Sequence, residues 1–201
     1  MAIDSYSTLV DAICDRMNDT GLSDYAPEFI QLAEASFNRR LNSLDMEGTA
    51  TIAADDSIPV PSDYKGAMSL RIDDYAPLAQ LSADDFQTKW HEANPGRPEN
   101  FAIFGGVINL GPAPDTSYTV AMAYLRTLTP LTSVNTTNWL LEQHPDLYLM
   151  GSLLQAEFRG WNDDRLPLIN SAVEGMIAEI NAHEARRKRG NLVDAVAAEY
   201  F

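Results

Sequence analysis

The sequence has a single cysteine, Cys14, few basic residues and no long apolar run. One cysteine excludes an internal disulfide framework. No apolar segment approaches the roughly 18 residues that a membrane-spanning helix needs. The first residues also lack the basic and apolar regions of a secretory signal. We therefore expect a protein that is made in a reducing cytoplasm and has no membrane partner.

Positive charge is scarce. Acidic residues outnumber basic ones by 29 to 14, which gives the 201-residue chain a formal net charge of −15. Such a chain is poorly suited to grip nucleic acid, because it repels the phosphates. Glycine and proline occur eleven times each, near the average, which excludes collagen-like and low-complexity classes. Aliphatic and aromatic residues run through most of the chain, and its length is sufficient to bury a core.

Motifs of enzyme sites are missing as well. The sequence contains no serine nucleophile elbow, no phosphate-binding loop and no dinucleotide fingerprint. The three histidines, His91, His144 and His183, show no zinc spacing. Pairs of adjacent aspartates lie at expected turns and helix starts, and neighbouring residues on a strand point to opposite faces. We therefore expect no catalytic residue, no metal site and no cofactor.

Helical periodicity marks both ends of the chain. Apolar residues recur at helical spacing over residues 6–17 and 29–44, which predicts a helical hairpin. A third stripe has alternating steps of three and four residues, the spacing of an antiparallel bundle seam. We expect Gly190 to end this last helix. The stripe consists of Leu166, Ile169, Val173, Met176, Ile180 and His183.

Short apolar runs divided by Asp, Pro and Gly occupy the middle of the chain. Large residues alternate over residues 118–125, which predicts a long strand with one large-residue face. Gly105 and Gly106 predict a hairpin turn with positive φ, and Pro59 suits an edge strand. The expected fold class is α+β, a helical bundle built from both termini with an inserted antiparallel β domain. Its expected parts are residues 1–46 (helical hairpin), 47–130 (β domain), 131–189 (C-terminal helices) and 190–201 (docking tail).

The one concentration of positive charge is the basic run Arg186, Arg187, Lys188 and Arg189. These side chains either offset the dipole at a helix C-terminus or contact an acidic partner or DNA. Both interpretations stay open.

An apolar stripe follows the basic run, on a segment too short to be a stable isolated helix. A frayed tail, or one packed on its own bundle, is the simple alternative. Docking in a partner's groove is favoured, because leaving large apolar side chains in water costs about 1.5–3 kcal/mol each. The stripe comprises Leu192, Val193, Val196, Tyr200 and Phe201.

Several segments, none of them a chemical site, carry a family resemblance through their order and spacing. They are residues 25–41, 58–64 (IPVPSDY), 105–114 (GGVINLGPAP), 137–141 (TNWLL) and 144–148 (HPDLY). In these segments the chain resembles the head-to-tail adaptor proteins of short-tailed bacteriophages, the family that includes tail tubular protein A. The resemblance covers most of the chain.

The resemblance implies a bundle with a projecting β part, subunits closed into a dodecameric ring below the portal, and DNA passing through the ring during ejection. The implied partners are further copies of the chain, the portal protein, which the C-terminal segment contacts, and the tail nozzle or next tail protein. The implied location is the head–tail junction of the virion, after assembly in the host cytoplasm. Acidic walls fit such a channel, because they repel phosphates within about 8–10 Å at ordinary salt.

Two other classes stay open: a small acidic cytoplasmic enzyme that uses the scattered carboxylates, and a monomeric binding module. Size under native conditions separates them from a ring, which elutes far above the mass of one chain. A monomer alone does not decide, because isolated adaptor subunits can stay monomeric until they meet the portal.

Overall fold

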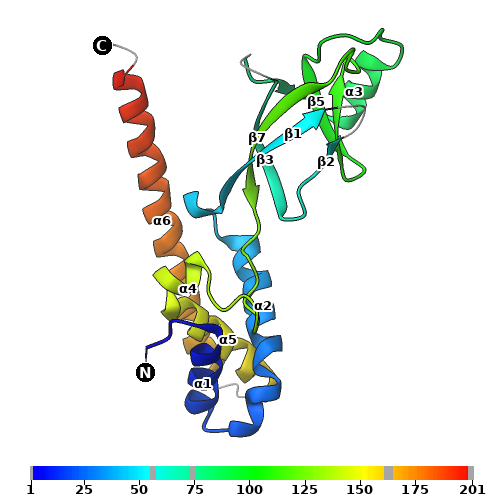
Figure 1. The fold of residues 1–201 in the computed structure, drawn as a ribbon. Helices are drawn as coiled ribbons and strands as arrows, with labels where there is room; N and C mark the ends of the chain where they lie inside the picture. The colour runs from blue at the N-terminus through cyan, green and yellow to red at the C-terminus, as the bar shows by residue number, and fades with distance from the viewer. Residues whose placement is uncertain (1, 55–57, 73–75, 161–164, 199–201) are drawn as a thin grey trace. The chain divides into compact units, whose positions relative to one another are not determined.

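A computed structural model of the protein describes residues 2–54, 58–72, 76–160 and 165–198 (Figure 1). The chain divides into two compact units, a helical unit (Met1–Asp45 with Leu128–Phe201) and a β unit (Met46–Thr127). Helices dominate the first and strands the second, so the α+β class predicted from the sequence is confirmed.

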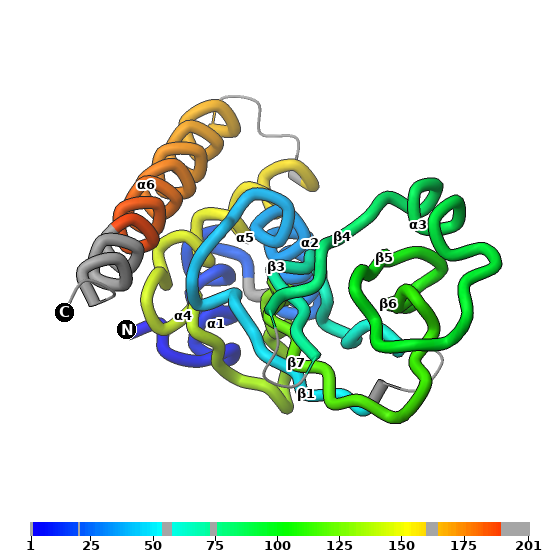
Figure 2. The backbone as a smooth tube through the Cα atoms, turned by 90° about the horizontal axis from the view of Figure 1, so that it is seen from above, coloured from blue at the N-terminus to red at the C-terminus, as the bar shows by residue number. Residues whose placement is uncertain are grey.

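The helical unit is organised around α5, which contacts the four helices α1, α2, α4 and α6. Helix α1 begins at Ser5, whose hydroxyl accepts the Thr8 N–H in a capping box, and ends at Asn18 in the left-handed conformation. The elements are α1 (Tyr6–Met17), α2 (Ala26–Arg40), α4 (Trp139–Gln143), α5 (Pro145–Gly160) and α6 (Leu166–Ala198), with the 3₁₀ helices η1 (Thr20–Asp24) and η2 (Leu44–Met46). Helix α6 packs against α5, as Figures 1 and 2 show.

The contact between α2 and α5 forms the centre of the helical core. The ring of Phe37 meets the ring of Tyr148 edge-on, with centroids 5.5 Å apart. Beside it, Gly151 of α5 lies against Phe37 so closely that a Cβ would come within 2.4 Å of the ring. Both rings are buried, so this close approach fixes how the two helices pack.

Helix α6 differs from the sequence prediction. It does not end at Gly190 but continues to Ala198. A glycine inside a helix costs only about 1 kcal/mol relative to alanine, and the residues on both sides favour helix. The seam also shifts: Met176 is only half-buried, and the side chain of His183 is 63% exposed. The buried positions are Ile169, Val173, Ile177, Ile180 and Glu184.

The β unit contains two sheets, with strand orders β1-β7-β3 and β2-β6-β5-β4. All pairs are antiparallel as predicted except β4 with β5, which is parallel. The strands are β1 (Glu47–Ala54), β2 (Ile58–Pro59), β3 (Tyr64–Ile72), β4 (Ala79–Gln80), β5 (Asn100–Phe104), β6 (Val107–Gly111) and β7 (Tyr118–Arg126), and α3 (Ala83–Trp90) precedes β5.

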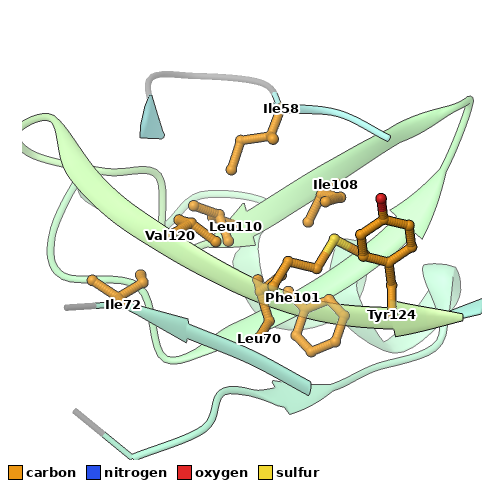
Figure 3. Close-up of a cluster of buried hydrophobic side chains, with 9 residues drawn as sticks. Ile58, Leu70, Ile72, Phe101, Ile108, Leu110, Val120 and Tyr124 are labelled. Carbon is orange, nitrogen blue, oxygen red and sulfur yellow. The ribbon is translucent and has the colours of Figure 1, made fainter. Parts of the chain in front are cut away.

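The large-residue face of β7 forms part of the core of this unit (Figure 3). Val120, Met122 and Tyr124 are buried there, which confirms the alternation. The hairpin prediction is also confirmed, because Gly105 and Gly106 join β5 to β6 with φ of 65° and 77°. Strand β2, which contains the proline predicted for an edge, is at one edge of its sheet. Within the described residues, no helix has the length and apolar character needed to cross a membrane.

Candidate partner-binding site on the C-terminal helix

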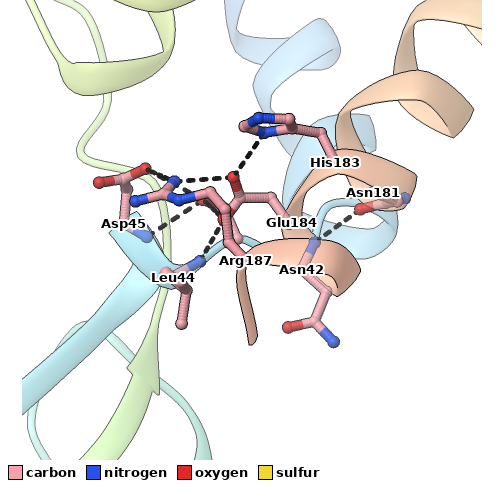
Figure 4. Close-up of polar contacts among 8 residues, drawn as sticks. Asn42, Leu44, Asp45, Asn181, His183, Glu184 and Arg187 are labelled. Carbon is pink, nitrogen blue, oxygen red and sulfur yellow. Dashed lines mark hydrogen bonds and ion pairs between the residues drawn. The ribbon is translucent and has the colours of Figure 1, made fainter. Parts of the chain in front are cut away.

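A buried carboxylate on α6 organises the surroundings of the basic run. Glu184 is 4% exposed and accepts the backbone N–H of Leu44 at 2.8 Å and the Ser43 hydroxyl at 3.0 Å (Figure 4). Arg187, one turn further on, donates to Glu184 at 2.7 Å and to Asp45 at 3.3 Å. A buried charge is tolerated only when it is paired and hydrogen-bonded, and Glu184 meets both conditions.

The surroundings hold this carboxylate in its ionised form. Burial by itself would raise the pKa of Glu184. The hydrogen bonds from the Leu44 amide, Arg187 and Ser43, together with the Arg187 charge, outweigh that effect and lower the pKa to about 2. Glu184 is therefore a buried, ionised residue with a structural role. Its hydrogen bonds hold α6 against Ser43 and Leu44.

A second set of contacts ties α6 to the end of α2 and to the residues that follow it. Asn181 accepts the backbone N–H of Asn42 at 3.1 Å and donates to the Arg40 carbonyl at 3.0 Å. Lys188 donates to the Asn42 side chain at 2.9 Å, and Arg40 pairs with Glu174. We call residues 41–45 the stem segment; in the chain it leads directly into β1. Helix α6 holds it at several successive turns.

The structure separates the four predicted basic residues into two pairs. Arg187 and Lys188 bind the stem segment, as described above. Arg186 and Arg189 are exposed. The interpretation of the run as compensation for a helix C-terminus is wrong, because α6 continues well beyond Arg189 and the dipole acts only within the last turn. Contact with a partner stays as the interpretation for the exposed pair.

Three of the apolar residues predicted to dock lie in the last turns of α6. Leu192, Val193 and Val196 belong to α6, which extends the basic run as one continuous helix. Their side chains, and Tyr200 and Phe201 altogether, fall outside the described residues. The predicted partner-binding segment thus begins as a helical extension of α6 and not as a separate tail after Gly190.

A pocket of about 330 Å³ opens beside Arg186, between the start of α5 and α6. Its lining mixes acids, imidazoles and one guanidinium, so it offers no uniform charge to a ligand. Among the residues that the structure describes, no group of three or more His, Cys, Asp or Glu side chains is placed to hold a metal ion. The lining residues are His144, Asp146, Met176, Glu179, Ile180, His183 and Arg186.

A second buried carboxylate lies in the centre of the helical unit. Glu34 of α2 is 5% exposed and accepts the Leu131 N–H at 2.8 Å and the Tyr148 hydroxyl at 3.0 Å. Tyr148 in turn accepts from Asn138 at 2.7 Å. Burial raises the pKa of Glu34, and its two hydrogen bonds only partly oppose this. Burial and the Glu34 charge raise the pKa of Tyr148 as well.

Sequence reasoning missed both carboxylates, because an acidic residue on an amphipathic helix is usually exposed. The helical period of the sequence nevertheless indicates that both carboxylates are buried. Glu34 is four residues after Ile30, Glu184 is four after Ile180, and both isoleucines are buried. A charged residue that continues an apolar stripe indicates a buried carboxylate with partners elsewhere in the chain.

The family model described as SU10 adaptor protein matches residues 4–196 of the chain. The match spans both units and reaches into the last turns of α6. No curated protein matches the chain.

Proposed function

Because this chain belongs to the SU10 adaptor protein family, we propose that it forms the ring between the portal and the tail of a bacteriophage virion. Copies of the chain join through the sides of their helices and the edges of their β units into a dodecamer. One face of the ring contacts the portal, and the opposite face binds the tail nozzle or the next tail protein. In this proposal the subunits assemble in the host cytoplasm and remain in the virion at the head–tail junction.

The portal is the proposed partner of the C-terminal part of α6. The observation that carries this assignment is the continuous helix itself. Its base is held by Glu184, and from there it presents exposed Arg186 and Arg189 before the apolar residues. An apolar stripe that begins on a helix held in this way suits docking into a groove, because docking removes its large side chains from water. The proposed contact residues are Arg186, Arg189, Leu192, Val193, Val196, Tyr200 and Phe201. The other two basic residues, Arg187 and Lys188, support this surface by binding the stem segment.

DNA passes through the ring without specific binding in this proposal. The net charge of −15 on each copy supports free passage of DNA, because acidic walls repel the phosphates and give them no favourable position at which to bind. The family is one of structural adaptors, and we propose no catalytic role for any residue.

The test is co-expression of the full chain with a tagged portal protein, followed by native mass measurement of what copurifies. The intact chain is expected to give a multi-subunit ring on the portal. Deleting residues 191–201, or changing Arg186→Glu together with Arg189→Glu, is expected to lower attachment about tenfold or more, as when central interface contacts are lost. Arg39→Glu is the matched control, because Arg39 is also exposed but lies on α2.

Two results would contradict the proposal. If the intact chain stays monomeric beside its portal, or forms only a two-fold dimer, it is not a ring subunit. If the truncated chain attaches as well as the intact one, the C-terminal part of α6 is not the portal contact.

A further inference from the structure

Residues 128–138, which we call the tip loop, are hydrogen-bonded to helix α2 at two points and to themselves at a third. At the start, the Leu128 N–H donates to the Asn38 side chain at 2.7 Å. In the middle, the Leu131 N–H donates to buried Glu34 at 2.8 Å. Near the end, the Asn138 side chain donates to the Thr129 carbonyl at 2.8 Å. These bonds restrict the conformations that the loop can adopt.

The apex of the tip loop is braced internally. The Thr132 hydroxyl accepts the N–H groups of Val134 at 3.2 Å and Asn135 at 2.9 Å. The Asn135 side chain donates to the Pro130 carbonyl at 2.7 Å. At the top of this turn the Val134 side chain is 94% exposed. A single exposed apolar residue is ordinary, but here several hydrogen bonds fix the backbone around it. Rigid loops that present a side chain in this way are typical of binding sites.

The β unit contains an apolar pocket whose chemistry suits an apolar side chain such as that of Val134. It has a volume of about 200 Å³ and lies between α3 and the β5–β6 hairpin. The rings of Phe86 and Phe104 meet in it at 6.0 Å, and both are only half-buried. Trp90 forms another wall and rests on Gly111, where a Cβ would come within 2.3 Å of the indole. Because that contact restricts the indole, the Trp90 wall is preformed. The pocket is lined by Phe86, Gln87, Trp90, His91 and Phe104.

Charge indicates which surfaces of two copies can meet. Each copy carries −15, so a contact surface without acidic residues adds no further repulsion between copies. The tip loop meets this condition, because no charged residue occurs between Arg126 and Glu142. The hairpin wall of the pocket meets it too, since none occurs between Glu99 and Asp115.

We propose that Val134 of one copy inserts into the Phe86–Trp90–Phe104 pocket of the next copy. The two surfaces are different, so the contact is heterologous, the kind that closes into a ring when the rotation fits. A branched three-carbon side chain suits a small aromatic pocket, and the rigid loop loses little freedom on insertion. This inference rests on the ring proposed above and names one contact within it.

Cysteine cross-linking tests the contact directly. In a Cys14→Ser background, one chain carries Val134→Cys and another carries Gln87→Cys, since Gln87 is exposed at the pocket. The two chains are co-expressed with the portal and oxidised. A covalent dimer is expected only when both chains are present, because a disulfide forms only where the Cα atoms approach within about 7 Å. A chain with both substitutions is expected to give a ladder of multimers. Leu168→Cys with Gln87→Cys is the control, because Leu168 is 75% exposed on another element.

A second measurement uses assembly itself. Val134→Asp is expected to lower ring yield about tenfold, because a carboxylate cannot enter an aromatic pocket unpaired, whereas Val134→Ile is expected to assemble normally. If rings form but the 134–87 pair does not cross-link, or Val134→Cys links to the portal instead, this contact is wrong and the ring proposal stands. If no ring forms with the portal, both proposals fail.

Discussion

The Glu184 carboxylate on α6 accepts the backbone N–H of Leu44 at 2.8 Å, although 140 positions separate the two residues in the chain. This contact fixes a turn of the C-terminal helix against the segment that leads into β1. The Ser43 hydroxyl and the Arg187 guanidinium bind the same carboxylate. A buried anion with three donors is costly to disturb, because each donor loses its partner when the anion is removed.

The first prediction concerns the stability of this network. Glu184→Gln keeps the shape of the side chain but removes its charge and brings an amide against the donors. We expect the free energy of unfolding to fall by about 1–3 kcal/mol, measured by urea denaturation at pH 7. Glu179→Gln is the control on the same helix; it is exposed and should change stability by less than about 0.5 kcal/mol. Equal effects of the two changes would contradict the assigned role.

The second prediction concerns pH. The pKa of Glu184 is lowered to about 2 in the folded protein, against about 4.3 in an unfolded chain. Its stabilising contribution is therefore fully present above about pH 5 and is lost as the pH falls towards 2. The difference in unfolding free energy between the native chain and Glu184→Gln should shrink over that range. A difference that stays constant from pH 7 to pH 2.5 would show that the charge is not responsible.

Local sequence patterns are sufficient to predict the helices and strands whose apolar residues recur at a regular spacing. Helix α1, helix α2 and strand β7 were predicted because their apolar residues follow periods of 3.6 and 2 over several turns or pairs. The β5–β6 hairpin was predicted from Gly105 and Gly106, because the two-residue turn needs positive φ. In each case the residues that determine the element lie within the element itself or at its turn.

Long-range relationships were not accessible from the sequence. The end of α6 was misplaced because the helix cost of Gly190 is small beside the helical preference of its neighbours. The parallel pairing of β4 with β5 has no local pattern. Within the candidate site, the position of Arg187 in a basic run was evident, but its acidic partner Asp45 lies 142 positions away. Contacts of that kind depend on tertiary packing and not on periodicity.

The third prediction compares two glycines in helices. At Gly151 a new Cβ would lie 2.4 Å from the buried Phe37 ring, so Gly151→Ala should destabilise the helical unit by about 1–3 kcal/mol. At Gly175 of α6 nothing lies within 4 Å of the Cβ position. Gly175→Ala should therefore stabilise the protein by up to about 1 kcal/mol through helix propensity. Thermal denaturation of both variants checks the pair, and a stabilising Gly151→Ala would mean that α2 and α5 do not pack this closely.

The fourth prediction concerns Glu34, which supports the tip loop from inside the helical unit. Burial raises the pKa of Glu34, so the folded protein favours its protonated form more than the unfolded chain does. Any stability gained from that protonation is present at low pH and is lost as the pH rises through the folded pKa. Glu34→Gln imitates the neutral form and keeps an oxygen for Leu131 and Tyr148. It should therefore be neutral or stabilising at pH 8.

Glu34→Ala differs, because it leaves the Leu131 N–H and the Tyr148 hydroxyl without this acceptor. We expect a loss of about 1–3 kcal/mol, together with faster hydrogen exchange at the Leu131 amide. The tip loop then loses its central support, although the apex bonds of Thr132 and Asn135 remain. Val134 is then held less firmly relative to α2, and ring yield with the portal should fall although Val134 itself is unchanged. Comparing Glu34→Ala with Glu34→Gln separates support of the loop from charge. If both variants assemble as well as the native chain, the rigidity of the tip loop has no part in assembly.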